Sequence, residues 1–108
     1  MRGEASVNPL VSVIVNCLNG EKYLAEALDS IKAQTYTNWE IVFWDNMSTD
    51  SSAQIARKFD PRLRYFKSQE TVGLGAARKL AVEQANGEFL AFLDCDDIWM
   101  PKKLEKQV

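Results

Sequence analysis

Four short apolar runs alternate along the chain with longer stretches in which apolar residues recur every three or four positions. The runs cover residues 10–17, 39–44, 63–66 and 89–93. The first is β-branched and almost continuously apolar, which is typical of a strand buried on both faces of a parallel sheet. The stretches between the runs predict helices at about 21–34, 51–59 and 73–85, and Pro101 suits the first turn of a terminal helix.

This alternation of strands and helices predicts an α/β fold. Right-handed crossovers between successive strands give a mostly parallel, Rossmann-like sheet of at least four strands, flanked by helices. Turn signals at Asn19-Gly20, Asp60-Pro61 and Asn86-Gly87 separate the elements, and Ser51 with Gln54 predicts a capping box. We expect one domain over residues 10–108, preceded by an N-terminal tail over residues 1–9.

The composition excludes several classes of partner and site. The 108 residues include 13 basic and 15 acidic side chains, so there is no electrostatic reason to expect nucleic acid as a partner. The absence of histidine leaves carboxylates, amines and thiols for any acid–base or metal chemistry. The run around residues 9–18 is too short to cross a bilayer, and two distant cysteines fit a reducing compartment. We therefore expect a cytoplasmic protein.

Polar side chains follow three of the four predicted strands. Asn16–Cys17 end the first strand, Asp45–Asn46 end the second, and Asp94–Asp97 (DCDD) end the fourth. In open α/β sheets, ligands bind beyond the carboxyl ends of the strands, where the strand order reverses. Carboxylate oxygens are the ligands that Mg²⁺ and Mn²⁺ prefer, and these cations usually share them with substrate phosphates. The pattern indicates half of a metal site.

Each of these features also has a purely structural interpretation. Asp94, Asp96 and Asp97 suit a solvated turn before a helix, and Asp45 suits a helix cap. Cys17 and Cys95 are expected to be two small, partly buried thiols rather than a redox pair, because the chain has no histidine to activate either. The three tryptophans, Trp39, Trp44 and Trp99, are expected to pack in the core.

Three stretches resemble, in order and spacing, the N-terminal motifs of family 2 glycosyltransferases. They are VSVIVNCLNGEKYL, EIVFWDNMSTD and VGLGAARKLAVEQANGEFLAFLDCDDIWMP, and the resemblance runs from about residue 10 to residue 107. It implies a GT-A fold and the metal-dependent transfer of a sugar from a nucleotide diphosphate-sugar donor to an acceptor hydroxyl, with inversion at the anomeric carbon.

The resemblance also implies where the nucleotide-sugar binds. It places seven residues at that site: Asn16, Cys17, Asn19, Asp45, Arg78, Asp94 and Asp96. Asp94 and Asp96 match the DXD motif, whose carboxylates hold Mn²⁺ or Mg²⁺ against the diphosphate. Asp45 matches an aspartate that reads the nucleotide base.

The remaining matches are accompanied by departures from the family pattern. Asn16 and Cys17 stand where a Pro-Thr pair is usual and would line the base pocket mainly through their backbone. Arg78 matches an arginine close to the nucleotide. Asn46 replaces a second aspartate beside Asp45. These differences leave the choice of nucleotide base open.

The resemblance covers only part of a catalytic domain, since members need roughly twice this length. The acceptor site and the general base are expected beyond Val108, so the chain corresponds to the donor-binding half and the isolated fragment is expected to be inactive. The full enzyme would use a sugar or a lipid-linked sugar as acceptor in polysaccharide biosynthesis, at most peripheral to the inner membrane face. Apolar surface exposed by truncation would favour self-association.

Two other functions compete with this interpretation. The first is a non-catalytic module that binds nucleotide-sugars or a protein partner. The second is a phosphoacceptor receiver domain, which has the same type of sheet and also uses Mg²⁺. A receiver domain needs an acceptor aspartate at the end of its third strand, and here that strand ends in Phe66-Lys67.

Overall fold

Four parallel strands form one sheet in the order β3-β2-β1-β4. The structure is a computed structural model that describes residues 8–108, so residues 1–7 of the predicted tail lie outside it. The strands are β1 (Val11–Cys17), β2 (Trp39–Asp45), β3 (Leu63–Lys67) and β4 (Phe89–Asp94). Every strand boundary agrees with its prediction to within one residue. The predicted parallel α/β sheet is confirmed.

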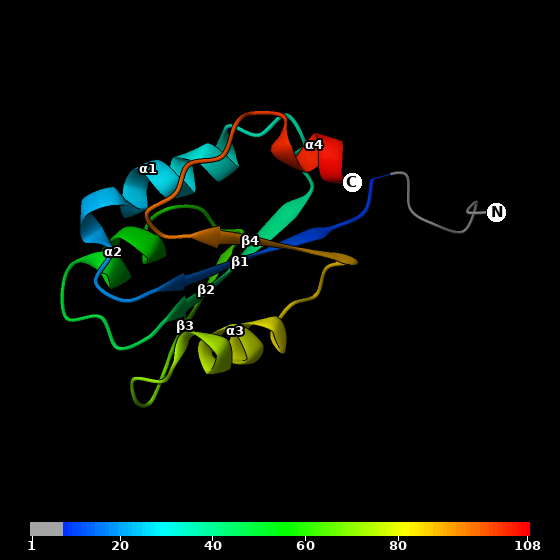
Figure 1. Cartoon of the computed structure of the whole chain (residues 1–108). Helices are drawn as coiled ribbons and strands as arrows, with labels where there is room; N and C mark the ends of the chain where they lie inside the picture. Colours follow the sequence, from blue (N-terminus) through cyan, green and yellow to red (C-terminus); the bar gives the residue numbers. More distant parts are fainter. Residues whose placement is uncertain (1–7) are drawn as a thin grey trace.

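Helices cover both faces of this sheet (Figure 1). They are α1 (Glu21–Lys32), α2 (Ser52–Arg57), α3 (Leu74–Val82) and α4 (Lys103–Gln107). Helices α1, α2 and α4 lie on one face and α3 lies on the other. All four helices were predicted, but α1, α2 and α3 end two or three residues early. The predicted capping box is wrong, because Ser51 at the start of α2 makes no side-chain capping hydrogen bond.

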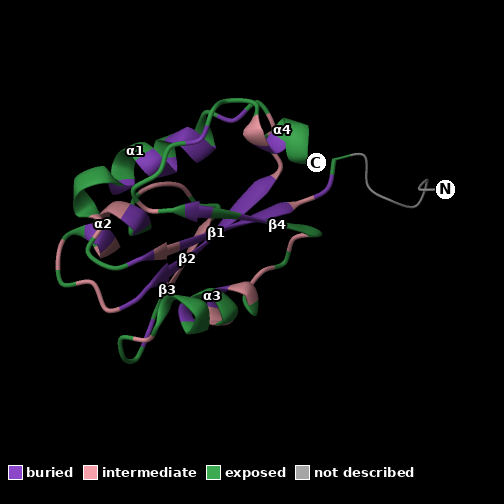
Figure 2. Ribbon diagram, viewed as in Figure 1, coloured by how far each residue is buried: buried purple, intermediate pink, exposed green. Residues whose placement is uncertain are grey.

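The core has two parts, one on each face of the sheet. The larger part packs α1, α2 and α4 against alternate residues of β1, β2 and β4, and the smaller part packs α3 against the residues between them. Strands β1 and β2 are buried along almost their whole length (Figure 2). Each buried Val, Leu or Ile side chain contributes about 1.5–3 kcal/mol. Trp39, Trp44 and Trp99 are buried, as predicted.

Strand β4 lies at one edge of the sheet and is the most exposed of the strands. Among the described residues it pairs only with β1, and the side chains of Phe89, Leu90 and Phe92 are 47%, 45% and 47% exposed. Apolar side chains are thus exposed on this strand. That truncation is the cause, and that the chain self-associates, remain predictions. No helix within residues 8–108 is long and apolar enough to cross a membrane.

The strand order creates a crevice between β1 and β4. From β1 the chain proceeds outward through β2 to β3, and it then crosses back to β4 on the other side of β1. The helix that leaves β1 and the helix that enters β4 therefore lie on opposite faces of the sheet. Such a reversal opens space beyond the carboxyl ends of the two strands. We call this line of strand ends, at Cys17, Asp45, Lys67 and Asp94, the carboxyl edge.

Candidate functional site

The strand register brings the predicted polar residues together at the carboxyl edge. Asn16 is aligned with Asp94 on β4, and Cys17 is aligned with Asp45 on β2. Neighbouring strands are about 4.8 Å apart, so all three strand ends lie within about 10 Å. The prediction that these ends meet along one edge of the sheet is confirmed.

A cavity of about 390 Å³ opens at the reversal of strand order, and we call it the acidic cavity. The residues that line it include Asn16, Asn19, Lys22, Tyr23, Asp94 and Asp96. Four of the seven predicted site residues therefore share one cavity. Lys22 and Tyr23 were not predicted. They lie in the first turn of α1, three residues of loop after β1, and that short connection is the signal that would have placed them here.

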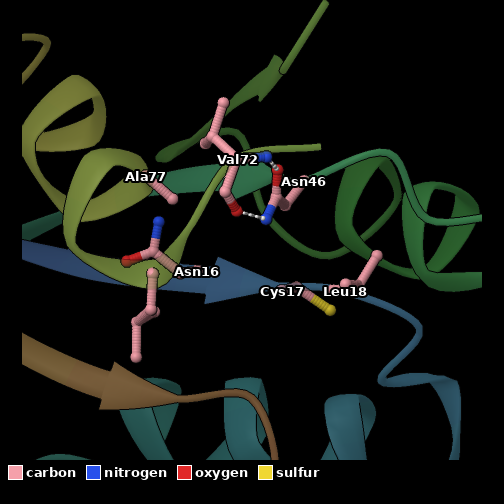
Figure 3. A pocket seen from close by; sticks show the side chains of 7 residues that line it. Asn16, Cys17, Leu18, Asn46, Val72 and Ala77 are labelled. Carbon is pink, nitrogen blue, oxygen red and sulfur yellow. Dashed lines mark hydrogen bonds between the residues drawn. The ribbon is translucent and has the colours of Figure 1, made fainter. Parts of the chain in front are cut away.

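A second cavity of about 230 Å³, the α3 cavity, adjoins the first between the end of β1 and helix α3 (Figure 3). Its lining includes Asn16, Cys17, Asn46 and Val72. The Asn46 side chain donates to the Val72 carbonyl at 2.7 Å and accepts from the Val72 amide at 2.9 Å. Asn46 therefore ties the loop before α3 to the end of β2, which explains why an amide suits this position.

The side-chain amide of Asn16 lies between the two cavities and is incompletely hydrogen-bonded. Its Nδ2 atom is buried and has no partner among the described residues. Figure 3 shows the amide beneath helix α3, close to Ala77. A buried polar group without a partner costs about 1–3 kcal/mol. Asn16 is thus a residue that the fold alone leaves unsatisfied.

Asp94 of β4, which lines the acidic cavity, forms an ion pair with Arg78 of α3. The Nη2 atom of Arg78 lies 3.6 Å from Oδ1 of Asp94, and the two side chains are 44% and 63% exposed. The Arg78 guanidinium also lies 5.8 Å from the centre of the Phe92 ring. Because both side chains are exposed, a ligand can reach them. An exposed ion pair contributes little to stability, so a ligand could replace it at small cost.

Asp45 reaches the carboxyl edge but points away from Asp94. Its carboxylate is buried, accepts a hydrogen bond from the Ser48 amide at 2.8 Å, and accepts another from the Tyr65 hydroxyl. Tyr65 packs against the core on the α1 side of the sheet, whereas Asp94 pairs with α3 on the other side. Burial and the hydrogen bond to Asp45 raise the pKa of Tyr65 to about 12. Asp45 lines neither cavity, so its role in reading a base stays a prediction.

Asn19 holds the loop that follows β1 against the loop that follows β2. Its backbone has a positive φ of 54°, which asparagine tolerates better than most residues. Its side-chain Oδ1 accepts a hydrogen bond from the backbone amide of Thr49 at 2.7 Å. Its backbone amide donates a hydrogen bond to Ser48 Oγ at 2.9 Å. Asn19 therefore shapes the wall of the acidic cavity.

The two thiols meet on the α1 side of the carboxyl edge. A Cβ placed on Gly20 would lie 2.7 Å from the Cys95 sulfur and 2.9 Å from the Cys17 sulfur. The hydrogen bond between the thiols lowers the pKa of Cys17 to about 7 and, together with burial, raises the pKa of Cys95. The sequence predicted two partly buried thiols but not their contact, which depends on the register of β1 and β4.

The chain offers a divalent cation two carboxylates rather than a complete coordination shell. Asp94 and Asp96 both line the acidic cavity, and within residues 8–108 no group of three or more Cys, Asp or Glu side chains is arranged to hold a metal ion. Mg²⁺ and related ions are usually held by one or two carboxylates together with substrate phosphates. The donor set therefore fits a cation that arrives with a phosphorylated ligand.

Comparison with known proteins agrees with this geometry. Residues 12–108 match the model of a protein family described as "Glycosyl transferase family 2". The chain belongs to this family. The resemblance stated from the sequence motifs is confirmed, and the receiver-domain alternative is not supported.

Two curated members of the family are similar along nearly the whole chain. The putative teichuronic acid biosynthesis glycosyltransferase TuaG of Bacillus subtilis is 39% identical over 103 residues, which are 93% of this chain and 41% of TuaG. The Escherichia coli glucosyltransferase WfgD, which uses UDP-glucose, is 38% identical over 100 residues, or 92% of this chain and 40% of WfgD. The chain thus spans about two fifths of the length of these relatives.

Solved structures of similar proteins confirm the fold. Staphylococcus aureus TarS (residues 1–349) in complex with UDP-GlcNAc superposes with a TM-score of 0.85 at 36% identity, covering 90% of this chain and 29% of TarS. The mannosyltransferase PcManGT from Pyrobaculum calidifontis, in complex with GDP-Man and Mn²⁺, has a TM-score of 0.80 at 31% identity, covering 87% and 29%.

Proposed function

We propose that this chain is the donor-binding part of a glycosyltransferase that transfers a sugar from a nucleotide diphosphate-sugar to an acceptor hydroxyl with inversion. The observation that carries the proposal is the acidic cavity, where Asn16, Asn19, Asp94 and Asp96 meet at the reversal of strand order. A cavity at this position of a parallel sheet is the usual ligand site of such folds. The nucleotide-sugars bound by TarS and PcManGT support the same class of ligand.

Asp94 and Asp96 are the residues that would hold Mn²⁺ or Mg²⁺. The chemistry that a bound cation supplies here is neutralisation of the charge on the departing diphosphate. Before any ligand arrives, Arg78 pairs with Asp94 and screens its charge. Arg78 would then exchange this contact for the diphosphate, because a guanidinium binds phosphate oxygens more strongly than one exposed carboxylate.

The α3 cavity is the proposed place of the base. Asn16 and Cys17 line it from β1, and Asn46 fixes the loop that forms its far wall. A ligand acceptor atom that reaches the Asn16 amide would provide the partner that Nδ2 lacks in the fold. Asp45 lies one strand further along the carboxyl edge, and its proposed contact with the base requires the Ser48 or Tyr65 hydrogen bond to be exchanged.

The acceptor and the cellular location follow the named relatives. TuaG is assigned to teichuronic acid biosynthesis, and WfgD acts on a diphosphoundecaprenol-linked GlcNAc. A sugar or a lipid-linked sugar is accordingly the proposed acceptor of the whole protein, in polysaccharide biosynthesis at the cytoplasmic face of a membrane. The general base is proposed to lie outside residues 1–108.

Isothermal titration calorimetry of the chain with UDP and GDP tests the proposal. We expect weak binding of at least one nucleotide in the presence of Mn²⁺ and none in the presence of EDTA. Circular dichroism of the same sample establishes that the chain is folded. Absence of binding to a folded chain, or affinity that is independent of metal, would contradict the proposal.

A further inference from the structure

We propose that Cys17 and Cys95 form a reversible disulfide that joins the end of β1 to the turn carrying Asp94 and Asp96, and thereby weakens binding at the acidic cavity. The effect on binding rests on the proposed function, whereas the disulfide itself does not. The two sulfurs face one small space beside Gly20, and Cys95 lies between the two carboxylates in the sequence.

The geometry of the strand ends suits a disulfide. Asn16 is aligned with Asp94 in the parallel pairing of β1 and β4. The next residues, Cys17 and Cys95, therefore lie on neighbouring segments of the chain. Neighbouring strands are about 4.8 Å apart, within the Cα separation of about 4.4–6.8 Å that disulfides require. Both side chains pack against the core on the α1 side, so the sulfurs point in the same direction.

Gly20 leaves the space in which the two sulfurs meet. The position of a Cβ on this residue would be less than 3 Å from both sulfur atoms, so a side chain there would displace them. Both sulfurs therefore face the same small space beside Gly20. Formation of the bond therefore needs a local movement at the ends of β1 and β4 rather than a rearrangement of the fold.

An oxidant can reach one of the two thiols directly. Cys95 is partly exposed and lines the acidic cavity, whereas Cys17 is only 2% exposed. A low-molecular-weight disulfide such as oxidised glutathione would exchange with Cys95, releasing one thiol and leaving a mixed disulfide. The Cys17 sulfur would then attack the Cys95 sulfur and release the second thiol. Two electrons and two protons pass from the protein to the oxidant, giving two molecules of reduced thiol.

The disulfide changes the turn more than it changes β1. Cys17 lies at the end of a central strand that pairs on both sides, whereas the turn at Cys95 is fixed by the hydrogen bond from the Asp97 amide to the Asp94 carbonyl at 3.0 Å. The distance between the two sulfurs must fall to about 2.05 Å, the length of a disulfide bond. The turn supplies most of that movement. Asp94 and Asp96 are displaced with it, toward the α1 side and away from Arg78.

The first test measures the bond itself. The chain is incubated with oxidised glutathione, remaining thiols are alkylated under denaturing conditions, and the intact mass is recorded. We expect a monomer whose mass is lower by two hydrogen atoms and which carries no alkyl group. Dithiothreitol should convert this monomer back to the form with two free thiols. Cys17→Ser and Cys95→Ser are the matched controls, since neither can form the bond. Retention of both thiols, an intermolecular dimer or a stable mixed disulfide in the unsubstituted chain would overturn the inference.

The second test measures the coupling to the acidic cavity. We expect oxidised chain to bind Mn²⁺ with UDP or GDP about tenfold more weakly than reduced chain. Because coupling is reciprocal, saturating Mn²⁺ and nucleotide should raise the reduction potential of the pair by about 30 mV, the equivalent of tenfold for a two-electron couple. Cys95→Ser should bind with an affinity that does not respond to the oxidant. Equal affinity of both forms overturns the coupling. A nucleotide that binds neither form overturns the proposed function and the coupling with it, while the mass measurement still decides the disulfide.

Discussion

The polar groups at the two ends of the strands differ in how completely they are hydrogen-bonded. At the amino edge, which we define by Ser12, Glu40, Arg64, Asn86 and Gly87, the polar groups bond to one another. Glu40 Oε2 accepts from the Ser12 hydroxyl at 2.6 Å and from the Asn86 amide at 2.7 Å, and its Oε1 lies 3.1 Å from Arg64 Nη1. The Gly87 amide donates to Ser12 Oγ at 2.7 Å. This network joins the starts of β1, β2 and β3 to the loop that leads into β4.

At the carboxyl edge two groups of the same types, on Asn16 and Asp94, are left open, although Asp45 and Asn46 are hydrogen-bonded. Asn16 Nδ2 is buried without a partner among the described residues, and the Asp94 side chain is 63% exposed with one weak ionic contact. A completed network of buried polar groups stabilises a fold, whereas an incomplete one costs stability unless a ligand completes it. The difference indicates that the amino edge contributes stability and that the carboxyl edge contributes binding. Substitutions at the two edges should separate these contributions.

The largest expected effect is the loss of binding in Asp96→Ala. This substitution removes one of two carboxylates from the acidic cavity, so we expect metal-dependent nucleotide binding to fall below detection, by a factor of at least about 100. Stability should change by less than about 0.5 kcal/mol, since Asp96 is exposed. Calorimetry and urea unfolding measure the two quantities.

Asp97→Ala is the matched control for Asp96→Ala. Asp97 lies in the same turn, but it does not line the acidic cavity. We expect it to retain nucleotide affinity to within about twofold. Equal losses in the two variants would show that general negative charge, and not a specific ligand position, attracts the cation.

The second effect is a loss of stability in Gly87→Ala. An added Cβ would lie 2.7 Å from the Leu10 carbonyl and from the Ser12 amide, both of which are backbone atoms that cannot rotate away. Overpacking of this kind costs about 1–3 kcal/mol, and the rigid neighbours place this site at the upper end. Urea unfolding should show the loss, while the folded fraction should bind nucleotide with unchanged affinity. An affinity that falls together with the stability would mean that the two edges are not independent.

Much of the fold was predictable because periodicity and turn signals are local. The strands at residues 11–17 and 39–45 are buried on both faces, so their continuous apolar runs identified them directly. The meeting of Asn16, Asp94 and Asp96 also followed, since parallel strands place their carboxyl ends together. The opposite direction of Asp45 did not follow, because side chains alternate between faces and one residue of register decides the face.

The contacts of long-range partners were not predictable for the same reason. The pairing of Cys17 with Cys95 depends on where β4 begins relative to β1, which the sequence does not encode locally. Glu40 and Arg64 are 24 residues apart, on two different strands, and only the folded sheet shows their shared network. A local motif can also be wrong, as the predicted capping box at Ser51 was. In the fold, the neighbouring Asp50 and Ser52 side chains instead accept hydrogen bonds from the loop after β1 and the start of α1.

The third effect is a loss of stability in Glu40→Gln, and it depends on pH. Burial alone would raise the pKa of Glu40, but hydrogen bonds from Ser12 and Asn86 and the charge of Arg64 hold it below the ordinary value of 4.5. The charged form is therefore the one that the fold favours. Its contribution is fully present above pH 4.5 and is lost as the pH falls through the lower pKa of the folded state.

Urea unfolding of both proteins at pH 7 and at pH 3 measures this dependence. At pH 7 we expect Glu40→Gln to be less stable than the unsubstituted chain by about 2 kcal/mol, because Arg64 loses its ion pair with the carboxylate and keeps its hydrogen bond to the Gln84 carbonyl. At pH 3 the difference should shrink, since the carboxyl of the unsubstituted chain is then largely protonated in the unfolded state. A difference that is constant with pH would mean that the charge of Glu40 does not contribute.

The smallest effect on stability is expected for Asn16→Ala, and it is the sharpest comparison of the two edges. Ser12 and Asn16 lie on the same strand, but Ser12 Oγ has two hydrogen-bond partners and Asn16 Nδ2 has none among the described residues. Ser12→Ala should cost about 1–2 kcal/mol, because Glu40 and Gly87 each lose a hydrogen bond. Asn16→Ala should change the free energy of unfolding by less than about 0.5 kcal/mol, since the lost packing is offset by removal of an unpaired amide.

Nucleotide affinity should respond in the reverse order, falling about five- to tenfold in Asn16→Ala and staying constant in the folded fraction of Ser12→Ala. If Asn16→Ala is instead the less stable of the two and binds normally, Asn16 stabilises the fold and the proposed contact with the ligand is wrong.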